Sequence, residues 1–238
     1  MTSQPSRPDG TPIRSYRTRF ELTEDPISEG GLWVNGRTDG IDWADVVTED
    51  GRAHGGKVRM SVAERRAEQG NLDGSAEEAA PEGDYDDPTA VLTGSWGRNQ
   101  YVRATIFSRN QTEDYFQEVE IRLRSAIAPQ SCTGYEVFWR CLKTENAYAE
   151  IVRWNGAIGT FKSLARNQGP QFGVSDGDVV EATIVGNRIT STINGVEVLA
   201  AIDDTYADGA PGIGFNFGCG DTYVDHGFTS YEVDTYAG

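Results

Sequence analysis

Residues 175–217 read SDGDVVEATIVGNRITSTINGVEVLAAIDDTYADGAPGIGFNF. Short runs rich in Val, Ile and Thr alternate in this stretch with pairs of turn residues, namely Gly186-Asn187, Asn194-Gly195 and Asp208-Gly209. β-Branched runs joined by such pairs are typical of antiparallel hairpins. The stretch therefore predicts antiparallel strands at 179–185, 188–193, 196–201 and 212–217.

The same pattern extends outward from this stretch in both directions. Further strands are expected at 20–22, 31–34, 41–47, 89–92, 101–108, 116–124, 135–141, 147–154, 159–165 and 229–233. No amphipathic helix of ordinary length lies between them, which argues against parallel βαβ units. We expect an all-β fold, a two-sheet antiparallel jelly-roll sandwich, with residues 20–238 as a single domain.

Two segments depart from the strand pattern. Residues 60–88 are acidic and poor in apolar side chains, and we expect an acidic surface insertion there. Residues 1–19 are polar and we expect an extended N-terminal arm, which could dock on another copy of the chain in a homo-oligomer or larger assembly. This arm carries four arginines: Arg7, Arg14, Arg17 and Arg19.

The formal net charge is −16, which disfavours nucleic acid and anionic membrane surfaces as partners. No run approaches the ~18 apolar residues of a membrane-spanning helix, so no membrane insertion is expected. The first twenty residues contain no apolar stretch of the kind found in a signal peptide. An extracellular or virion-surface location would then require a removed leader or a viral origin.

The three cysteines are Cys132, Cys141 and Cys219, and an odd number leaves at least one without a partner. A bridge between Cys132 and Cys141 is one alternative. Nothing in the sequence points to an oxidising compartment, so buried free thiols are the expected state.

Three further stretches carry a resemblance to known proteins: GYEVFWRC at 134–141, AYAEIVRWNGAIGTFKSLA at 147–165 and PISEGGLWVNG at 26–36. Together with residues 175–217 they resemble the concanavalin A-like lectin/glucanase superfamily of laminin-G-like jelly rolls. The resemblance covers about residues 20–235 without the insertion. It implies contact with carbohydrate, and it leaves open whether the chain binds or catalyses.

Two enzymatic alternatives follow from this resemblance. Glucanases of the superfamily carry a Glu-x-Asp-x-x-Glu strand, and the nearest match here is Glu118-Val119-Glu120-Ile121-Arg122-Leu123, with Leu123 in place of the last acid. A polysaccharide lyase would use arginines to neutralise a uronate and a tyrosine as base. If the chain is an enzyme, the candidate residues are Glu118, Glu120, Arg122, Arg124, Tyr135 and Tyr148. Period-two alternation places Glu118, Glu120, Arg122 and Arg124 on one face, expected to be solvated.

A non-catalytic sugar site would combine aromatic platforms with charged and amide side chains. Trp43 and Trp96 are the better candidates for exposed platforms, because both lie close to predicted loops, and at least one of Trp139 and Trp154 is expected in the core. The candidate ligand-binding residues are Trp43, Trp96, Arg98, Asn99, Trp139, Arg140 and Glu150.

Jelly rolls of this kind often hold a structural Ca²⁺ with carboxylates near the chain ends. The acids suited to that role here are Glu24, Asp25, Asp221 and Asp225. Carbohydrate recognition without catalysis is thus the first functional expectation, followed by a structural role such as a virion surface protein, and then by a glycoside-processing enzyme or lyase.

Overall fold

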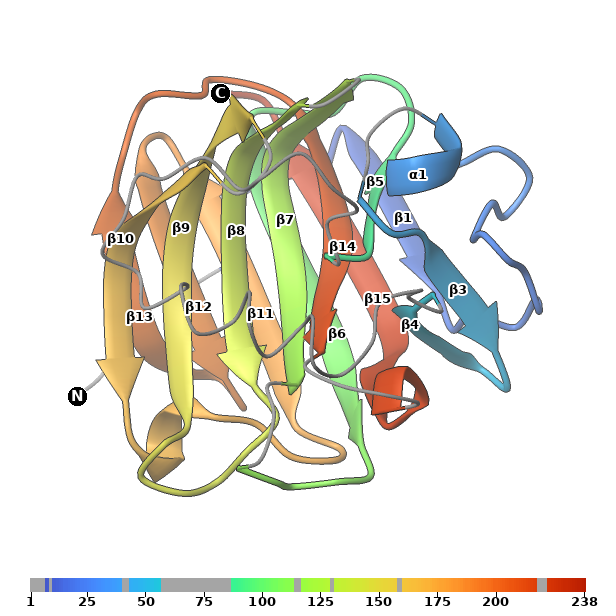
Figure 1. Ribbon diagram of the computed structural model, residues 1–238. Coiled ribbons are helices and arrows are strands. Elements are labelled where there is room, and N and C mark those ends of the chain that lie inside the picture. Colours follow the sequence, from blue (N-terminus) through green and yellow to red (C-terminus); the bar gives the residue numbers. More distant parts are fainter. Residues whose placement is uncertain are drawn as a thin grey trace.

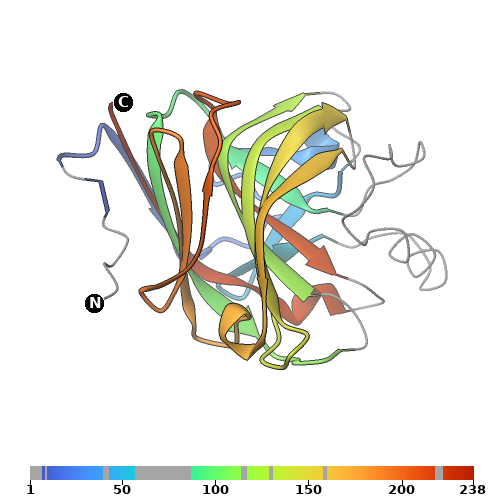
Figure 2. The same cartoon turned by 90° about the vertical axis from the view of Figure 1, so that its left-hand side faces the viewer.

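The computed structural model describes residues 7–8, 10–39, 43–56, 87–113, 117–128, 131–157, 160–217 and 222–238. In this part of the chain two β-sheets face each other and enclose the core between them (Figure 1). Figure 2 shows the sheets edge-on, with sheet A on the left and sheet B on the right. The pairings between the described strands are antiparallel, as the sequence predicts for a jelly-roll sandwich.

Sheet A has eight strands in the order β13-β12-β11-β6-β15-β4-β3, and β1 pairs with β15 beside β4. Its strands are β1 (Arg14–Thr18), β3 (Val46–Glu49), β4 (Arg52–Gly55), β6 (Asn99–Ser108), β11 (Val179–Val185), β12 (Arg188–Ile193), β13 (Val196–Ile202) and β15 (His226–Tyr236).

Sheet B has seven strands in the order β10-β9-β8-β7-β14-β5-β2. Its strands are β2 (Trp33–Asn35), β5 (Thr89–Leu92), β7 (Gln117–Ala128), β8 (Ser131–Arg140), β9 (Tyr148–Ala157), β10 (Phe161–Gln168) and β14 (Ala210–Phe217). The described helices are short: α1 (Gly36–Asp39) and the 3₁₀ turns η1 (Pro170–Phe172) and η2 (Thr222–Val224). None of them has the length and apolar character needed to cross a membrane.

The strands predicted between residues 89 and 233 are present with small shifts of their ends. The Asn194-Gly195 turn joins β12 to β13 with φ of 51° and 78°, the left-handed conformation that a tight hairpin turn requires. Asn155-Gly156 instead lies inside β9, and Asn35-Gly36 leads into α1. The insertion expected at 60–88 lies outside the described residues, apart from its last two positions.

The core forms because one face of each sheet is apolar. On β7 the side chains of Val119, Ile121 and Leu123 point inward and are fully buried. They pack with residues of sheet A such as Val102 and Val233 in one continuous hydrophobic cluster. Cys141 belongs to this cluster, and both Cys132 and Cys141 are buried free thiols, as expected; Cys219 lies outside the described residues.

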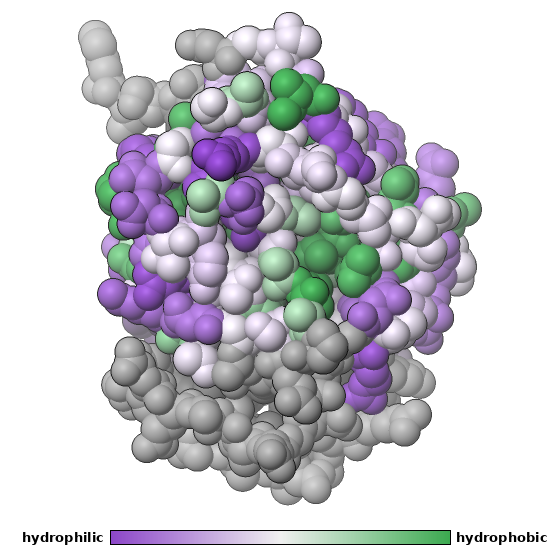
Figure 3. Space-filling model, turned by 90° about the horizontal axis from the view of Figure 1, so that it is seen from above, coloured by the Kyte–Doolittle hydropathy of each residue, from purple (hydrophilic) through white to green (hydrophobic). Residues whose placement is uncertain are grey.

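Large apolar side chains also occur at isolated positions on the surface. The exposed ones are Ile13, Leu22, Leu32, Val185, Val196 and Ile202. Figure 3 shows the molecule from above, where a small group of hydrophobic residues lies between hydrophilic ones. Scattered exposure of this kind is ordinary at a protein surface.

The N-terminal region differs from the expected arm. Residues 14–18 form strand β1, which pairs with Tyr231–Thr235 of β15, and no strand forms at 20–22. Phe20 has a φ of 54° and its ring is buried in the core, so the chain turns sharply directly after β1. The boundary between arm and domain therefore does not lie at residue 19, because β1 belongs to sheet A.

Three of the four arginines of this region, Arg7, Arg14 and Arg17, contact acids and aromatic rings of their own chain. Arg17 lies 2.9 Å from Glu232 and 3.2 Å from Asp234, and Arg7 forms ion pairs with the same two acids. Arg14 stacks on the ring of Trp96 at 3.8 Å. Docking of the arm on a neighbouring subunit remains a prediction from the sequence. Because these arginines already contact their own chain, fewer arginine side chains are left to bind a neighbouring subunit.

A bulge in β7 separates Arg124 from the acids that precede it. The pairing of β7 with β8 shifts between Leu123 and Ala126, and Arg124 has a φ of 45°. The expectation that Arg124 shares a face with Glu118 and Glu120 is therefore wrong. Its guanidinium instead donates to three backbone carbonyls, those of Arg98 (2.8 Å), Tyr206 (3.0 Å) and Gly186 (2.8 Å). Arg124 thus ties three connecting segments to the sandwich.

Replacement of Arg124 by alanine should lower the free energy of unfolding by about 2–4 kcal/mol, because three charge-assisted hydrogen bonds are lost from a buried site. Arg124→Gly should be less destabilising than Arg124→Ala by about 1 kcal/mol, since glycine tolerates the left-handed backbone. Urea denaturation measures both. Arg98→Ala, at an exposed side chain, is the control, with an expected change below about 0.5 kcal/mol. Equal stability of wild type and Arg124→Ala would contradict this role.

Candidate functional site

The outer face of sheet B, which points away from the core, gathers most of the charged residues singled out in the sequence. Facing residues on neighbouring strands form three rows across it. The first contains Asn216, Glu118 and Arg140; the second Gly214, Glu120, Phe138, Glu150 and Arg166; the third Gly212, Arg122, Glu136, Val152 and Ser163. Each row runs from β14 toward the edge of the sheet.

The part of this face around β7 is not solvated, contrary to the expectation from the alternating charges. Glu118, Glu120, Arg122 and Glu136 are between 0% and 6% exposed. A second hydrophobic cluster, separate from the core, lies on the same face and contains Trp43, Cys132, Val152 and Trp154. β7 is therefore buried on both sides, although its sequence alternates between apolar and charged residues.

Arg122 lies at the centre of the buried charges. Its Nη2 atom is 2.7 Å from Oε2 of Glu136 and 3.3 Å from Oε2 of Glu120. Burial alone would lower the pKa of the guanidinium, but the two glutamates outweigh that effect and raise it. Arg122 therefore remains a cation that holds two carboxylates close to a single nitrogen.

Aromatic rings enclose this cation. The Arg122 guanidinium lies 4.9 Å from the ring centre of Trp43 and 5.7 Å from that of Trp154, and the two rings contact each other at 4.7 Å. Trp154 also donates its Nε1 proton to Oε2 of Glu136 at 2.9 Å. Such cation–π contacts strengthen when water is excluded. Trp43 is thus a buried cover over Arg122, and the expectation that it forms an exposed platform is wrong.

A glycine on β14 provides the space that these charges need. A Cβ atom placed on Gly214 would lie 2.3 Å from Oε2 of Glu120 and 3.2 Å from Nε of Arg122. Any larger residue would therefore displace the Glu120 carboxylate. In the sequence Gly212-Ile213-Gly214, the two glycines place no side chain on the outer face of β14, whereas the side chain of Ile213 points into the core.

Glu118 has an unusually weak acidity for a glutamate. Its two oxygens accept hydrogen bonds from the Tyr148 hydroxyl and from Nδ2 of Asn216, the latter at 2.9 Å. Burial raises the pKa of Glu118 to about 7, partly offset by these two hydrogen bonds. Burial and the nearby Glu136 also raise the pKa of Glu120 well above its usual range. Near neutral pH this face can therefore hold protons on carboxylic acids.

The accessible part of the outer face lies at the edge strand β10 and at Phe138 of β8, whereas the outward-facing residues of β9 are largely buried. Arg166 on the edge strand β10 is 45% exposed, stacks on the Tyr148 ring at 4.0 Å and lies 2.6 Å from Glu150. Phe138 and Phe161 are half-buried on the same face. Arg140 is largely buried and donates to the carbonyls of Asn146 (3.0 Å) and Glu113 (3.4 Å).

Several candidate residues lie elsewhere. Tyr135 points into the sandwich, and its hydroxyl donates to Asp203 at 2.8 Å. Trp139 is fully buried in the core, as expected for one of Trp139 and Trp154. Neither residue can contribute to a site on the outer face of sheet B.

The group near residue 98 also lies apart from this face. Arg14 stacks on Trp96, so that ring is not an open platform. Asn99 donates to the Ala237 carbonyl and accepts from the Gly186 amide, both at 2.9 Å, which gives it a structural role. Arg98 is exposed, and its carbonyl receives the Arg124 bond. Because these three residues lie beside the C-terminal residues and β1, the structure does not bring them to Arg140 or Glu150.

Two of the four acids proposed for Ca²⁺, Glu24 and Asp225, are engaged in other contacts. Glu24 accepts from the amides of Ser28 (3.0 Å) and Glu29 (2.8 Å), and Asp225 lies 3.8 Å from Arg109. Asp25 is exposed, and Asp221 lies outside the described residues. In the described ranges no group of three or more His, Cys, Asp or Glu side chains is placed to hold a metal ion.

Sequence reasoning did not identify Glu136, Asn216, Phe138 and Arg166 as members of this site. A signal for Glu136 was available, because it alternates with Tyr135 and Val137 and so faces away from the core on the strand next to β7. Arg166 and Asn216 carry no such signal, since their place depends on the strand order of sheet B.

No protein family and no curated protein sequence matches this chain. Solved structures do. The carbohydrate-binding module CBM66 from Bacillus subtilis aligns with a TM-score of 0.52 and 11% identity over 89% of this chain and 97% of that one. The exoplasmic/lumenal domain of VIP36, solved in a Ca²⁺/Man3GlcNAc-bound form, gives 0.55 and 10% over 90% and 89%. The Bacillus licheniformis β-glucanase gives 0.52 and 10% over 93% and 98%.

The chain has the concanavalin A-like lectin/glucanase fold. This confirms the resemblance drawn from the sequence and the expected jelly-roll sandwich. At about one identical residue in ten these similarities establish the fold alone, so the function of the outer face of sheet B has to be argued from its own chemistry.

The raised pKa of Glu118 predicts a pH-dependent contribution to stability. The unfolded chain ionises Glu118 near 4.5 and the folded chain near 7, so the contribution is complete below 4.5 and is lost as the pH rises through 7. The free energy of unfolding of wild type relative to Glu118→Gln should therefore fall by about 3 kcal/mol over this window. Urea denaturation between these pH values measures the difference. The exposed Glu145→Gln is the control, and parallel curves for wild type and Glu118→Gln would contradict the assignment.

Proposed function

We propose that the chain is a non-catalytic carbohydrate-recognition module and that sugar binds on the outer face of sheet B, over β8, β9 and β10. The observation that carries the proposal is the Arg166–Glu150 pair stacked on Tyr148, with half-buried Phe138 and Phe161 on the same face. Aromatic side chains suit the apolar faces of sugar rings, and a charged pair can donate to and accept from neighbouring hydroxyls.

The buried charges behind this region support the proposal by holding it rigid. Glu118 fixes the Tyr148 hydroxyl, and the Tyr148 ring in turn supports Arg166. A binding residue whose rotamer is fixed in advance loses less conformational entropy on binding. Arg122, with Glu120 and Glu136, would then serve as the foundation of the site and not as a group that contacts sugar.

The fold offers a second line of support. One of the similar structures is a carbohydrate-binding module and another was solved with Man3GlcNAc bound. For this chain a carbohydrate ligand is therefore the first partner to test, and the Ca²⁺-bound form of VIP36 makes Ca²⁺ a condition to vary in that test. An assembly role, such as that of a virion surface protein, has less support, because three of the four arginines of the N-terminal region, Arg7, Arg14 and Arg17, contact their own chain.

A glycan array followed by calorimetric titration of the bound glycan tests this proposal. Arg166→Gln should weaken binding about tenfold or more, since a charge-assisted hydrogen bond contributes about 1.5–3 kcal/mol. Phe138→Leu, which keeps apolar volume and removes the ring, should also weaken it. Lys162→Gln is the matched control, because Lys162 is exposed on the same strand but points to the other face. Unchanged affinity in both Arg166→Gln and Phe138→Leu would refute the location of the site.

One observation favours an enzyme as the second candidate. Glu118 is a buried acid with a pKa of about 7, hydrogen-bonded to a tyrosine, on the strand that resembles the catalytic strand of glucanases. Against hydrolysis by a retaining mechanism, Leu123 occupies the position of the last acid and is fully buried in the core. Glu118 and Glu120 are themselves buried, so this strand does not supply the pair of accessible carboxylates that a double displacement needs.

We expect no release of reducing ends from laminarin or lichenan, measured with a reducing-sugar assay over pH 5 to about 8, the range in which Glu118 titrates. Glu118→Gln serves as the control for trace activity. Hydrolysis by wild type that disappears in Glu118→Gln would show that the chain is an enzyme.

A further inference from the structure

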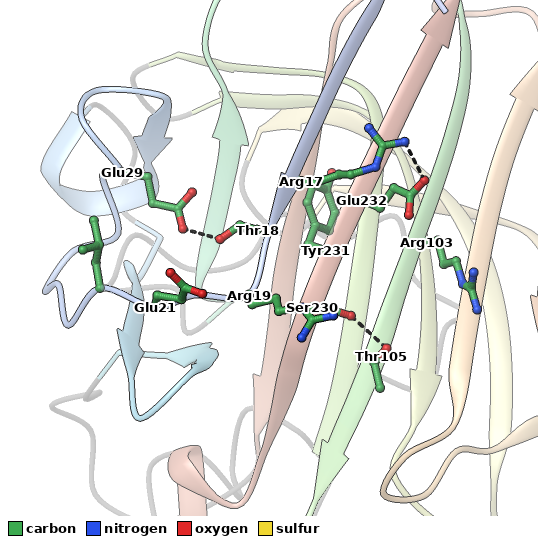
Figure 4. A pocket seen from close by; sticks show the side chains of 11 residues that line it. Arg17, Thr18, Arg19, Glu21, Glu29, Arg103, Thr105, Ser230, Tyr231 and Glu232 are labelled. Atoms are coloured by element: carbon green, nitrogen blue, oxygen red, sulfur yellow. Dashed lines mark hydrogen bonds and ion pairs between the residues drawn. The ribbon is translucent and has the colours of Figure 1, made fainter.

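A groove of about 610 Å³ lies on the outer face of sheet A, on the opposite side of the sandwich from the proposed sugar site (Figure 4). Its lining comes from the end of β1, from the segment at residues 19–29 and from the exposed faces of β6 and β15. The groove lining contains three arginines (Arg17, Arg19 and Arg103) and three glutamates (Glu21, Glu29 and Glu232). Its size is within the range of small-molecule sites.

Most of these charges already have partners. Glu232 accepts from Arg17 at 2.9 Å and lies 3.5 Å from Arg7. Glu29 accepts from the Thr18 hydroxyl at 2.5 Å, and burial raises its pKa. Arg103 is held loosely, with Nε 4.0 Å from Glu181. These pairs largely neutralise one another, so they do not by themselves attract an ion.

Two charges of the lining have no such partner in the described part of the chain, the acid Glu21 and the cation Arg19. Of the two, Arg19 is the one that can bind an anion. Its side chain has no hydrogen bond and no ion pair with any residue in the described part of the chain, although it lines the groove together with Ser230 and Thr105 (Figure 4). Its backbone is fixed on both sides, because the Phe20 ring is buried and the Phe20 amide donates to Thr18 Oγ1 at 2.9 Å. The fold thus presents an unpaired guanidinium at a defined place, next to hydroxyl groups.

A guanidinium of this kind is suited to a planar or tetrahedral oxyanion, to which it can donate two parallel hydrogen bonds. Ser230 donates to Thr105 at 2.8 Å, so the two hydroxyls form a chain that can also reach a bound ligand. The net charge of −16 disfavours a polyanion. A ligand with one anionic group avoids most of that repulsion, since distant surface charges are screened at physiological salt.

We propose that this groove is a second ligand site, for a small molecule or sugar unit that bears one carboxylate or sulfate group anchored by Arg19. The proposal is independent of the sugar site on sheet B, because it depends on other residues and on the other face of the sandwich. Arg103 assists from the other side of the groove, and Glu21, an exposed acid in the lining, opposes binding.

Calorimetric titration with sodium sulfate, D-glucuronate and D-glucose, at ionic strength matched with NaCl, tests the proposal. We expect millimolar binding of sulfate, glucuronate or both, and none of glucose at this site. Arg19→Gln should weaken anion binding about tenfold or more, whereas Glu21→Gln should strengthen it. Arg98→Gln, at another exposed arginine without an ion pair in the described residues, should bind like wild type.

The two anions distinguish the sources of the oxyanion. Binding of glucuronate alone assigns a carboxylate ligand, and binding of sulfate alone assigns a sulfate ester. Arg166→Gln should leave anion binding unchanged, which separates this site from the one on sheet B. Equal anion affinity in wild type and Arg19→Gln, or no heat from either anion beyond the NaCl control, would overturn the proposal. Circular dichroism melts of each variant verify that the fold is intact.

Discussion

The burial of one guanidinium, that of Arg122, governs the outer face of sheet B. A buried arginine is tolerated only if carboxylates and hydrogen bonds replace the water it has lost. Glu136 and Glu120 both lie next to Arg122 in the structure and supply these carboxylates. Two carboxylates around one cation leave an excess of negative charge. The excess negative charge is reduced when a carboxyl group keeps its proton. This agrees with the raised pKa of Glu120 and with that of Glu118, two residues earlier on the same face of β7.

Other features of the face follow from the same requirement. Gly214 has no side chain where Glu120 and Arg122 need room, and Trp43 and Trp154 cover the guanidinium from the side on which water would otherwise enter. Trp43 precedes β3, so this face is complete only when the N-terminal half of the chain has folded against β7–β9. Because the centre is closed in this way, the surface left for a ligand is displaced toward β10, where Arg166 and the two phenylalanines remain accessible.

The sequence predicted the sandwich well because strand alternation and turn pairs are local signals. It placed Val119, Ile121 and Leu123 in the core correctly, and it grouped Glu118, Glu120 and Arg122 on one face. It could not show that this face is buried, because charged residues opposite a core normally point to water, and the aromatic cover comes from distant segments.

The sequence also misplaced Arg124, since a single left-handed residue reverses the alternation and nothing in the residues Arg122-Leu123-Arg124 marks it. β1 was missed for a related reason: its polar, arginine-rich residues predicted an extended arm, and only pairing with β15 and its acids makes them a strand.

The position of a charged residue within a row of facing residues determines whether it has partners in the protein. This position accounts for where the two proposed ligand sites lie. On sheet A the facing residues Arg17, Glu232, Arg103 and Glu181 alternate in sign across four strands, so that each interior charge has an opposite neighbour on both sides. A residue at the end of such a row has a neighbour on one side only. Arg166 is in that position on the edge strand β10, where it pairs with Glu150. Arg19, one residue beyond β1, lines a groove with Ser230 and Thr105 and has no acid paired to it among the residues that the structure describes. A charged residue in the middle of such a row already has partners within the protein, so a ligand adds little to it. A charged residue at the end of a row keeps hydrogen-bond donors that contact solvent. We therefore expect ligands to bind at the ends of these rows.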